Sequence, residues 1–290
     1  MTRQIAIIGA GIAGLAAARQ LHAAGLACTL FDKGRGVGGR MATRRVDGFH
    51  FDHGAQFFTA KGASFGALVA EWRDAGQAAE WFDGAFVGTP GMSTPTNALA
   101  ADGLGFGPYE AVILAMPAPQ IVPLLAMAGL SFHELAAVRY APCWALMLGF
   151  RAPVAMPWDR LRPDDEAVAW IACGAGKPGR EGQAETVVAH ATPAWSRNRL
   201  EDDAATITRD LLARVQALTG IEAAPDFAAS HRWRHALVEQ PAGIACLWDA
   251  EARIGACGDW ALGPRIEAAF DSGEALAAAV IGALESDNAD

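Results

Sequence analysis

The sequence lacks the features of a membrane-spanning protein, a nucleic-acid-binding protein or a domain held by metal or disulfides. No uninterrupted apolar run approaches the roughly 20 residues that a transmembrane helix needs. The 23 Lys and Arg residues against 32 Asp and Glu residues give a net charge of −9, without a basic block, so nucleic acid is not an expected partner. Five cysteines without Cys-x-x-Cys spacing argue against a disulfide framework and a zinc site, and fit reduced thiols in the cytoplasm.

Tyrosine and lysine are also scarce, because the chain has only two Tyr and three Lys, at 33, 61 and 177. By contrast, 52% of the 290 residues are hydrophobic and 19% are charged, which is enough to bury a large core. We therefore expect a soluble globular protein with two closely packed lobes.

Residues 5–15 carry the most specific pattern, an apolar strand that runs into Gly9-x-Gly11-x-x-Gly14. In such a motif the first glycine allows a tight turn, the second lets backbone N–H groups reach a pyrophosphate, and the third lets a helix pack on the sheet. Asp32 ends the next apolar run, where its carboxylate can accept hydrogen bonds from both hydroxyls of an adenosine ribose. The pattern predicts a dinucleotide site that suits FAD or NAD better than NADP.

Two other interpretations of this segment were weighed. One is an ordinary strand, turn and alanine-rich helix that only packs. The other is a signal peptide with Arg3 before the apolar stretch and cleavage near residues 16–18, but cleavage there would remove the dinucleotide motif.

Periodicity and the positions of Gly and Pro predict the remaining elements. Strands are expected at 49–58, 109–116, 147–150, 186–191, 231–235 and 254–259, and helices at 64–75, 200–218 and 265–284. Gly220 is expected to stop the helix at 200–218. Since the last strand and helix resemble the first pair, both ends of the chain are expected to share one domain.

Six motifs in this order resemble the renalase-like branch of the FAD-dependent amine oxidase superfamily, in a bacterial form. They lie at 9–14, 34–43, 52–58, 139–144, 231–236 and 258–268 and cover nearly the whole chain. The resemblance implies an α/β fold in which a Rossmann-type FAD-binding domain with a parallel sheet is interleaved with an α+β substrate domain. We assign residues 1–62, 88–128 and 250–290 to the FAD-binding domain, and 63–87 and 129–249 to the substrate domain.

The motifs also suggest how a non-covalent FAD would be held. Gly39 lacks a side chain where the backbone must approach a phosphate, and the charge of Arg40 can neutralise that phosphate. The alternative is a solvated surface loop without a ligand. Gly54 and Ala55 leave room for a flat isoalloxazine ring. The resemblance implies that Asp259 accepts from a ribityl hydroxyl, an exposed turn aspartate being the alternative. The expected FAD contacts are Gly9, Gly11, Ala13, Gly14, Asp32, Lys33, Gly39, Arg40, Met41, His53, Gly54, Ala55, Gln56, Gly258, Asp259 and Ile266.

Four residues are expected to position a substrate ring against the flavin: Gln56, Thr192, His235 and Trp260. Alternation along the strand at 231–235 places His235 on one face with two other aromatic residues, and the resemblance makes this face part of the substrate wall. Each assignment has an alternative: Gln56 as a polar strand end, Thr192 as a helix cap and His235 as a structural histidine.

Residues 98–111 depart from the resemblance, because renalase-like proteins carry a sheet strand and an antiparallel connection in this interval. Fourteen residues are too few for a helix end, a strand and a crossover. Either the domain lacks a strand or the sequence omits residues here, and the intact motifs on both sides favour omission.

The resemblance implies an FAD-dependent oxidase of isomeric dihydronicotinamide dinucleotides, 2- or 6-dihydroNAD(P), which transfers hydride to flavin N5 and then reduces O2 to H2O2. One alternative is a flavin amine oxidase, which commonly uses a lysine near N5 and tyrosines around the amine. Lys33 follows the ribose acid and Lys177 sits in a Lys-Pro-Gly turn, so neither is well placed. The other alternative is a non-catalytic dinucleotide-binding protein, supported only by the short interval at 98–111.

Overall fold

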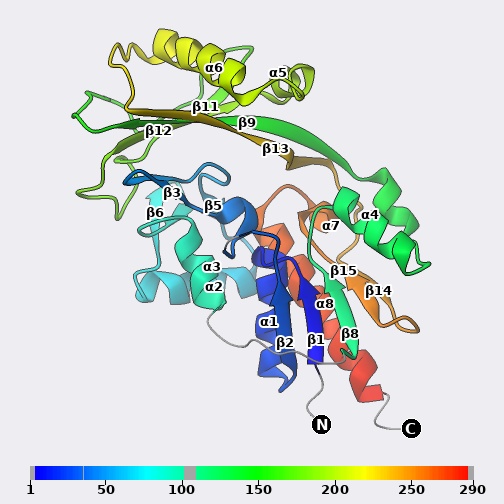
Figure 1. Cartoon of the computed structure of the whole chain (residues 1–290). Coiled ribbons are helices and arrows are strands. Elements are labelled where there is room, and N and C mark those ends of the chain that lie inside the picture. The colour runs from blue at the N-terminus through cyan, green and yellow to red at the C-terminus, as the bar shows by residue number, and fades with distance from the viewer. Residues whose placement is uncertain (1–3, 35, 101–108, 287–290) are drawn as a thin grey trace.

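The protein is described by a computed structural model over residues 4–34, 36–100 and 109–286. Two layers face each other (Figure 1). The lower lobe contains a mostly parallel sheet close to both termini, and the upper lobe contains a long antiparallel sheet. Short strands at residues 44–59 lie between these two sheets. The predicted α/β class with a parallel sheet is confirmed.

The lower sheet has the strand order β14-β15-β8-β1-β2. Its strands are β1 (Gln4–Ile8), β2 (Ala27–Phe31), β8 (Ala111–Leu114), β14 (Leu247–Asp249) and β15 (Ile254–Ala256). β1 runs parallel to β2 and β8, β15 runs parallel to β8, and only β14 is antiparallel. β15 thus joins the sheet that β1 begins, so both ends of the chain contribute strands to one sheet.

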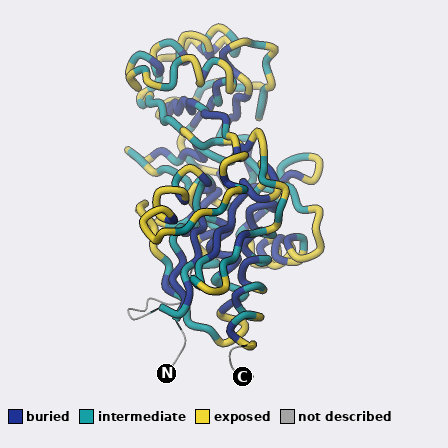
Figure 2. Tube along the Cα trace, turned by 90° about the vertical axis from the view of Figure 1, so that its right-hand side faces the viewer, coloured by how far each residue is buried: buried dark blue, intermediate teal, exposed yellow. Residues whose placement is uncertain are grey.

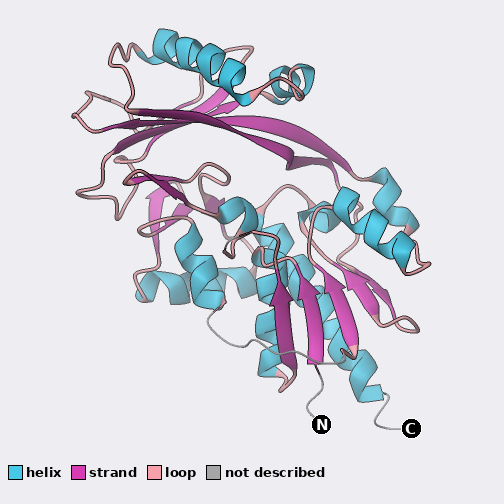
Figure 3. Cartoon of the chain, in the orientation of Figure 1, coloured by secondary structure: helices cyan, strands magenta, loops and turns pink. Residues whose placement is uncertain are grey.

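Two helices from opposite ends of the chain, α1 (Ile12–Ala23) and α8 (Ile266–Ser286), pack together in the lower lobe, as Figure 3 shows. They lie close together at Gly273, where a Cβ atom would lie 2.1 Å from the carbonyl oxygen of Ala13. The glycine therefore sets how closely the two helices approach.

The upper sheet has the strand order β10-β11-β12-β9-β13. Its strands are β9 (Arg139–Phe150), β10 (Arg160–Leu161), β11 (Val168–Cys173), β12 (Glu185–Ala191) and β13 (Phe227–Gln240). Helices α5 (Pro193–Asn198) and α6 (Ala204–Thr219) cover its outer face (Figure 1). α6 begins after Asp203, whose side chain accepts a hydrogen bond from the Thr206 N–H, and ends at Gly220 with φ +73°, as predicted. Figure 2 shows exposed residues along the outer turns of this end of the molecule.

Smaller elements connect the lobes. They are β3 (Arg44–Val46) with β4 (Phe49–Phe51), the sheet of β5 (Phe58–Thr59), β7 (Ala85–Gly88) and β6 (Ala78–Phe82), the helices α2 (Ala63–Asp74), α3 (Ser93–Leu99), α4 (Ala118–Met127) and α7 (Asp259–Leu262), and 3-10 turns at Gly39–Met41 and His133–Ala137. The β5-β7-β6 sheet spans the proposed domain boundaries near residues 62 and 87, and β14 pairs with β15 across the one at 250. The division into domains stays a proposal.

Several predicted strands differ from the observed ones. The single strand expected at 49–58 is wrong: β4 and β5 are separated by residues 52–57, whose polar groups bond to other segments. The strands expected at 147–150 and 231–235 are parts of the much longer β9 and β13. The strand expected at 109–116 is shorter, because β8 covers only four residues.

The short interval at 98–111 lies largely outside the described residues, which exclude 101–108. Both explanations of it therefore stay open. In the part of the chain that the structure describes, β2 is the last strand at that edge of the lower sheet.

Among the described residues, no helix has both the length and the apolar character needed to cross a lipid bilayer.

Helix packing at Gly273 gives a test of the fold. We expect Gly273→Ala to lower the free energy of unfolding, because the new Cβ has no room beside Ala13. Gly282 lies on the same helix with open space around it, so Gly282→Ala should instead stabilise the protein by up to about 1 kcal/mol through helix propensity. Chemical denaturation of both variants measures the difference, and equal effects would contradict the packing argument.

Candidate functional site

The first glycine-rich turn has the geometry that the sequence predicts. Gly9 follows β1 with φ +113°, and its N–H donates to the carbonyl of Phe31 at 2.7 Å. A Cβ atom at Gly14 would lie 2.0 Å from the carbonyl oxygen of Gly9, which explains why the helix needs a glycine there. A Cβ atom at Gly11 would meet nothing within 4 Å. The turn therefore leaves open space at Gly11, where a pyrophosphate is expected.

The second glycine-rich loop lies directly against the first. Gly38 N–H donates to the carbonyl of Ala10 at 2.8 Å, and a Cβ atom at Gly39 would lie 3.6 Å from the Cα atom of Gly11. Gly39 itself has φ +54°, in the left-handed region that glycine favours. The contacts join residues 28 positions apart in the chain, and the two loops thus form one surface.

Asp32 stands at the end of β2 beside these loops. Its carboxylate accepts from the N–H of Ala10 at 2.8 Å and from the N–H of Gly34 at 2.6 Å, and the residue is exposed. The neighbouring Lys33 points away, with its Nζ 3.4 Å from Oε1 of Gln120. The exposed Asp32 carboxylate retains acceptor capacity for a ligand, since each carboxylate oxygen has more than one lone pair.

Arg40 connects this loop to the C-terminal segment and to the upper lobe. Its guanidinium makes a bidentate pair with Asp259, at 2.6 and 2.8 Å. It also donates to the carbonyls of His235 and Ala236 on β13, both at 3.3 Å. Burial alone would lower the pKa of Arg40, but the Asp259 carboxylate more than offsets this, so its pKa lies above the ordinary value. Two predicted cofactor residues therefore meet each other.

Tyr140 completes this group. Sequence analysis did not assign this residue to the site. Its hydroxyl donates to Oδ1 of Asp259 at 3.3 Å, and its ring lies edge-on to the ring of His235 with centroids 5.4 Å apart. Burial, followed by the Asp259 charge, raises the pKa of Tyr140, so the phenol is protonated. The predicted residue His235 thus lies next to the Arg40–Asp259 pair.

Trp260 and Ile266 belong to the segment that follows β15. Trp260 is fully buried and packs in a core cluster with residues of β8, α4 and β13, including Leu114, Ile121 and Val238. This position does not support stacking on a flavin. Gly258, with φ +156°, and Ile266, the first residue of α8, frame the turn around Asp259.

The carbonyl of His53 is held by the upper sheet. It accepts from Nε1 of Trp233 on β13 at 3.0 Å, and Nε2 of His190 on β12 lies 3.1 Å away. The His53 ring packs against the rings of Trp233 and His231, with centroids 5.1 and 5.0 Å away. Ala55, two residues on, donates its N–H to the carbonyl of Arg40 at 2.8 Å. The segment expected to face the flavin is therefore fixed from both lobes.

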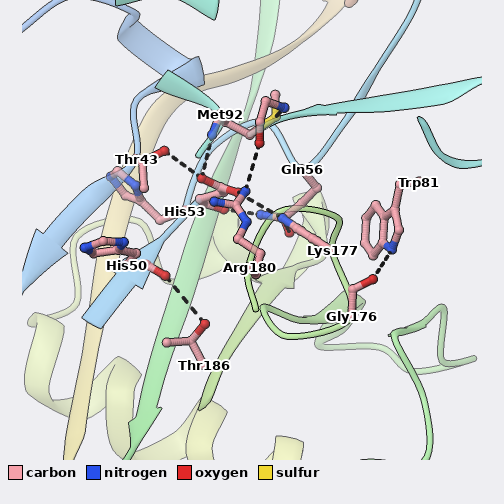
Figure 4. Close-up of polar contacts among 12 residues, drawn as sticks. Thr43, His50, His53, Gln56, Trp81, Met92, Gly176, Lys177, Arg180 and Thr186 are labelled. Atoms are coloured by element: carbon pink, nitrogen blue, oxygen red, sulfur yellow. Dashed lines mark hydrogen bonds and ion pairs between the residues drawn. The ribbon is translucent and has the colours of Figure 1, made fainter. Parts of the chain in front are cut away.

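A buried ion cluster lies beside the same segment (Figure 4). Oδ2 of Asp52 accepts from Nη2 of Arg180 at 2.6 Å and from Nζ of Lys177 at 3.2 Å. Oδ1 accepts from the Thr43 hydroxyl at 2.7 Å and from the N–H of Met92 at 3.0 Å. The side chains of Asp52, Lys177 and Arg180 are only 3, 4 and 4% exposed, so these charges are desolvated.

These charges change each other's ionisation. Burial alone would raise the pKa of Asp52, but Lys177 and Arg180 outweigh it, so the carboxyl stays ionised with a pKa below its ordinary value. Burial lowers the pKa of Lys177, although Asp52 opposes that shift. Among the described residues, the cavity beside the cluster has a volume of about 10 Å³, which is room for about one water molecule. The cluster therefore organises the protein and does not itself hold a substrate.

Gln56 is part of this cluster. Its Nε2 donates to the carbonyl of Asp52, and its Oε1 accepts from Nζ of Lys177 at 3.1 Å. The expectation that the Lys-Pro-Gly turn places Lys177 poorly for an amine-oxidase lysine near N5 stays a prediction. Sequence analysis missed that the residue is buried and that its Nζ contacts a predicted catalytic side chain. The turn exists, but it folds back onto residues 52–56.

Thr192 lies at the start of α5. Its hydroxyl oxygen accepts from the N–H of Trp195 at 3.2 Å and donates to the carbonyl of Glu166 at 2.6 Å. It is the helix cap that was the alternative interpretation. No contact in the described part of the chain links it to Gln56, His235 or Trp260, so the structure does not support Thr192 as a substrate-positioning residue.

The histidines around His53 predict an acid-sensitive fold. Burial lowers the pKa of His53 and of His190 to about 4, from an unfolded value near 6.5. The unfolded chain therefore binds more protons between pH 6.5 and 4, and the free energy of unfolding should fall as the pH falls through that window. His190→Gln can keep a donor near the His53 carbonyl and does not titrate. The variant should therefore lower by about one the number of protons that the chain takes up on unfolding in this window.

Denaturation curves at a series of pH values measure the effect. The matched control is His133→Gln, at a side chain that is 94% exposed. If both variants keep the wild-type pH dependence, the buried histidines are not its source.

Part of the chain is similar in sequence to known proteins. Residues 7–73 match the family described as "NAD(P)-binding Rossmann-like domain". A stretch of 50 residues, 17% of this chain, is 54% identical to the 4,4'-diapophytoene desaturase (4,4'-diaponeurosporene-forming) of Staphylococcus haemolyticus. That match spans 10% of the relative's length, so this chain is similar to only a small part of that protein.

Solved structures match over nearly the whole chain. A putative protoporphyrinogen oxidase from Exiguobacterium sp. 255-15 has a TM-score of 0.75 at 13% identity, covering 97% of this chain and 99% of that one. Cyclohexylamine oxidase from Brevibacterium oxydans has a TM-score of 0.70 at 14% identity, covering 98 and 100%. A putrescine oxidase bound to putrescine has a TM-score of 0.68 at 14% identity, covering 97 and 99%. The chain thus contains an NAD(P)-binding Rossmann-like segment within the two-lobe fold of these oxidases.

Proposed function

We propose that this protein is an FAD-dependent oxidoreductase that binds FAD non-covalently across its two touching glycine-rich loops. The proposal rests on one observation. The surface formed by the two glycine-rich loops contacts the upper lobe through Arg40, Asp259 and His53. Gly11 has open space around it while Gly9 and Gly14 are enclosed, and Asp32 is exposed at the strand end. These residues fit a dinucleotide.

Each residue then has a separate task in holding the cofactor. The N-terminus of α1 faces the pyrophosphate, Asp32 accepts from the ribose hydroxyls, and Arg40 adds positive charge near the phosphates. Asp259 would accept from a ribityl hydroxyl and Ala55 would lie against the ring. At Gly54 a Cβ atom would lie 2.1 Å from the carbonyl oxygen of Arg40, so the glycine is needed for that contact between the two segments. The flavin supplies a two-electron acceptor, and the protein supplies orientation.

For the substrate, we favour isomeric dihydronicotinamide dinucleotides, 2- or 6-dihydroNAD(P), with O2 as the final oxidant and H2O2 as its product. The support is the resemblance of six ordered motifs and the place of His235 beside Tyr140 and Arg40. His235 and Gln56 orient the substrate ring for hydride transfer. Cytoplasmic location agrees with such a substrate.

Amine oxidation is the second candidate, because putrescine and cyclohexylamine oxidases share the fold. Two contacts weigh against it. Tyr140 is bonded to Asp259, and Lys177 is bonded to Asp52 and Gln56. Neither side chain is available for an aromatic cage or a lysine-held water of the usual amine-oxidase kind. A non-catalytic dinucleotide-binding protein remains the alternative of another class.

Anaerobic stopped-flow absorbance of the purified holoprotein tests the assignment. We expect 2- or 6-dihydroNAD(P) to bleach the flavin rapidly, NADH and a panel of amines to do so slowly, and H2O2 to form in an amount equal to the flavin reduced when air returns. Rapid bleaching by amines alone would support the second candidate. Bound flavin that no compound reduces would leave only the binding protein.

Cofactor binding itself has a matched pair of variants. Gly11→Ala should leave the free energy of unfolding of the apoprotein nearly unchanged, because the Cβ has room, but should weaken FAD binding by about tenfold or more, or about 1.4 kcal/mol, since it fills the approach to the pyrophosphate. Gly66→Ala on α2 also has room and lies outside the dinucleotide surface, so it serves as the control. Equal FAD affinity in both, measured by fluorescence titration, would place the cofactor elsewhere.

A further inference from the structure

Two partners of opposite kind decide the orientation of the Gln56 side chain. The ammonium group of Lys177 can only donate, so the amide atom 3.1 Å from it must be the oxygen Oε1. The carbonyl oxygen of Asp52 can only accept, so its contact must come from the nitrogen Nε2. Both contacts require the same orientation, and a flipped amide would lose both hydrogen bonds.

This orientation leaves one donor unused. The Nε2 group of Gln56 carries two N–H bonds, and in the described part of the chain only the carbonyl of Asp52 accepts from it. Gln56 follows Ala55, next to the place proposed for the isoalloxazine ring. The side chain therefore has an N–H, and not a carbonyl oxygen, for a cofactor or substrate.

Lys177 is itself fixed within the loop that joins β11 to β12. Its ammonium lies 5.3 Å from the ring centroid of Trp81, whose Nε1 donates to the carbonyl of Gly176 at 2.7 Å. Arg180 in the same loop donates to the Gly88 carbonyl at 3.3 Å as well as to Asp52. Figure 4 shows Lys177 and Arg180 of this loop beside Gln56, which comes from another segment. The loop thus holds the ammonium in one place.

We propose that Lys177 is a positioning residue which makes Gln56 a hydrogen-bond donor toward the reacting rings. By holding Oε1, it leaves the second N–H of Nε2, and not the oxygen, for a group beside Gln56, and a donor there would stabilise negative charge that develops on a ring accepting hydride. The identity of the ring rests on the proposed function, but the orientation of the amide does not. The cavity of about 10 Å³ is too small for a substrate, so Lys177 acts through Gln56.

The variant that tests this is Lys177→Met, which keeps the length and the apolar stem beside Trp81 and removes the donor. It leaves Asp52 with Arg180, a pair without net charge, so we expect the protein to fold. If the Lys177→Met variant does not fold, Lys177→Ala is the second variant that removes the donor. Lys177→Arg keeps a donor, and Lys61→Met makes the same chemical change at an exposed lysine.

The first measurement is NMR of the Gln side-chain amides in 15N-Gln-labelled holoprotein, with the Gln56 signals assigned by Gln56→Leu. We expect hydrogen exchange of the Gln56 NH2 group to be about tenfold faster in Lys177→Met, because a charge-assisted hydrogen bond no longer holds the amide. Exchange should stay at the wild-type rate in Lys61→Met and close to it in Lys177→Arg. Unchanged exchange in Lys177→Met would overturn the proposal.

The second measurement is the flavin midpoint potential, titrated with a chemical reductant so that no substrate is needed. Lys177→Met and Gln56→Leu should both lower the potential, and the double variant should match Gln56→Leu alone, since Lys177 acts through Gln56. Additive shifts would show that Lys177 acts independently and would overturn the proposal. If no dihydronicotinamide reduces the wild-type flavin, the proposed substrate falls while the exchange and potential data still decide the role of Lys177.

Discussion

The arrangement of the two lobes depends on the buried carboxylate of Asp52. Four donors from three other parts of the chain converge on its two oxygens: the Thr43 hydroxyl, the N–H of Met92, and the cations of Lys177 and Arg180. Removing one partner from a buried ion pair typically costs about 3–5 kcal/mol, because the remaining charge stays desolvated. The loop of the upper lobe that carries Lys177 and Arg180 is therefore held against the lower lobe by a strong electrostatic constraint.

Two other bridges act in parallel with this cluster. Arg40 joins Asp259 to the carbonyls of β13, and Trp233 and His190 hold the carbonyl of His53. All three bridges lie around residues 52–56, which are neither helix nor strand between β4 and β5. An irregular segment that must present its backbone to a ligand needs such external partners, because it has no ladder of its own to satisfy its polar groups.

The sequence predicted the parts of the structure that depend on residues close together in the chain. The turn from β1 into α1 and the helix end at Gly220 follow from spacing, and the structure confirms them. Lys177 could not be found in this way, since its partner Asp52 lies 125 residues away and a Lys-Pro-Gly segment looks like an exposed turn. Trp260 was expected to contact a substrate because it follows Asp259 in the sequence. Its side chain lies in the core instead, since adjacent residues can face different surroundings.

The charges around the site bear on which substrate it accepts. Two buried cations face one buried carboxylate next to Gln56, which leaves one excess positive charge, while Arg40 at the other side of the same segment is paired with Asp259. An amine reaches an oxidase mostly as a cation, which must lose a proton and enter against this charge. A dihydronicotinamide dinucleotide brings a neutral ring and an anionic pyrophosphate, which the same cations attract. Within the proposed function, this charge is a better match to the dinucleotide than to the amine.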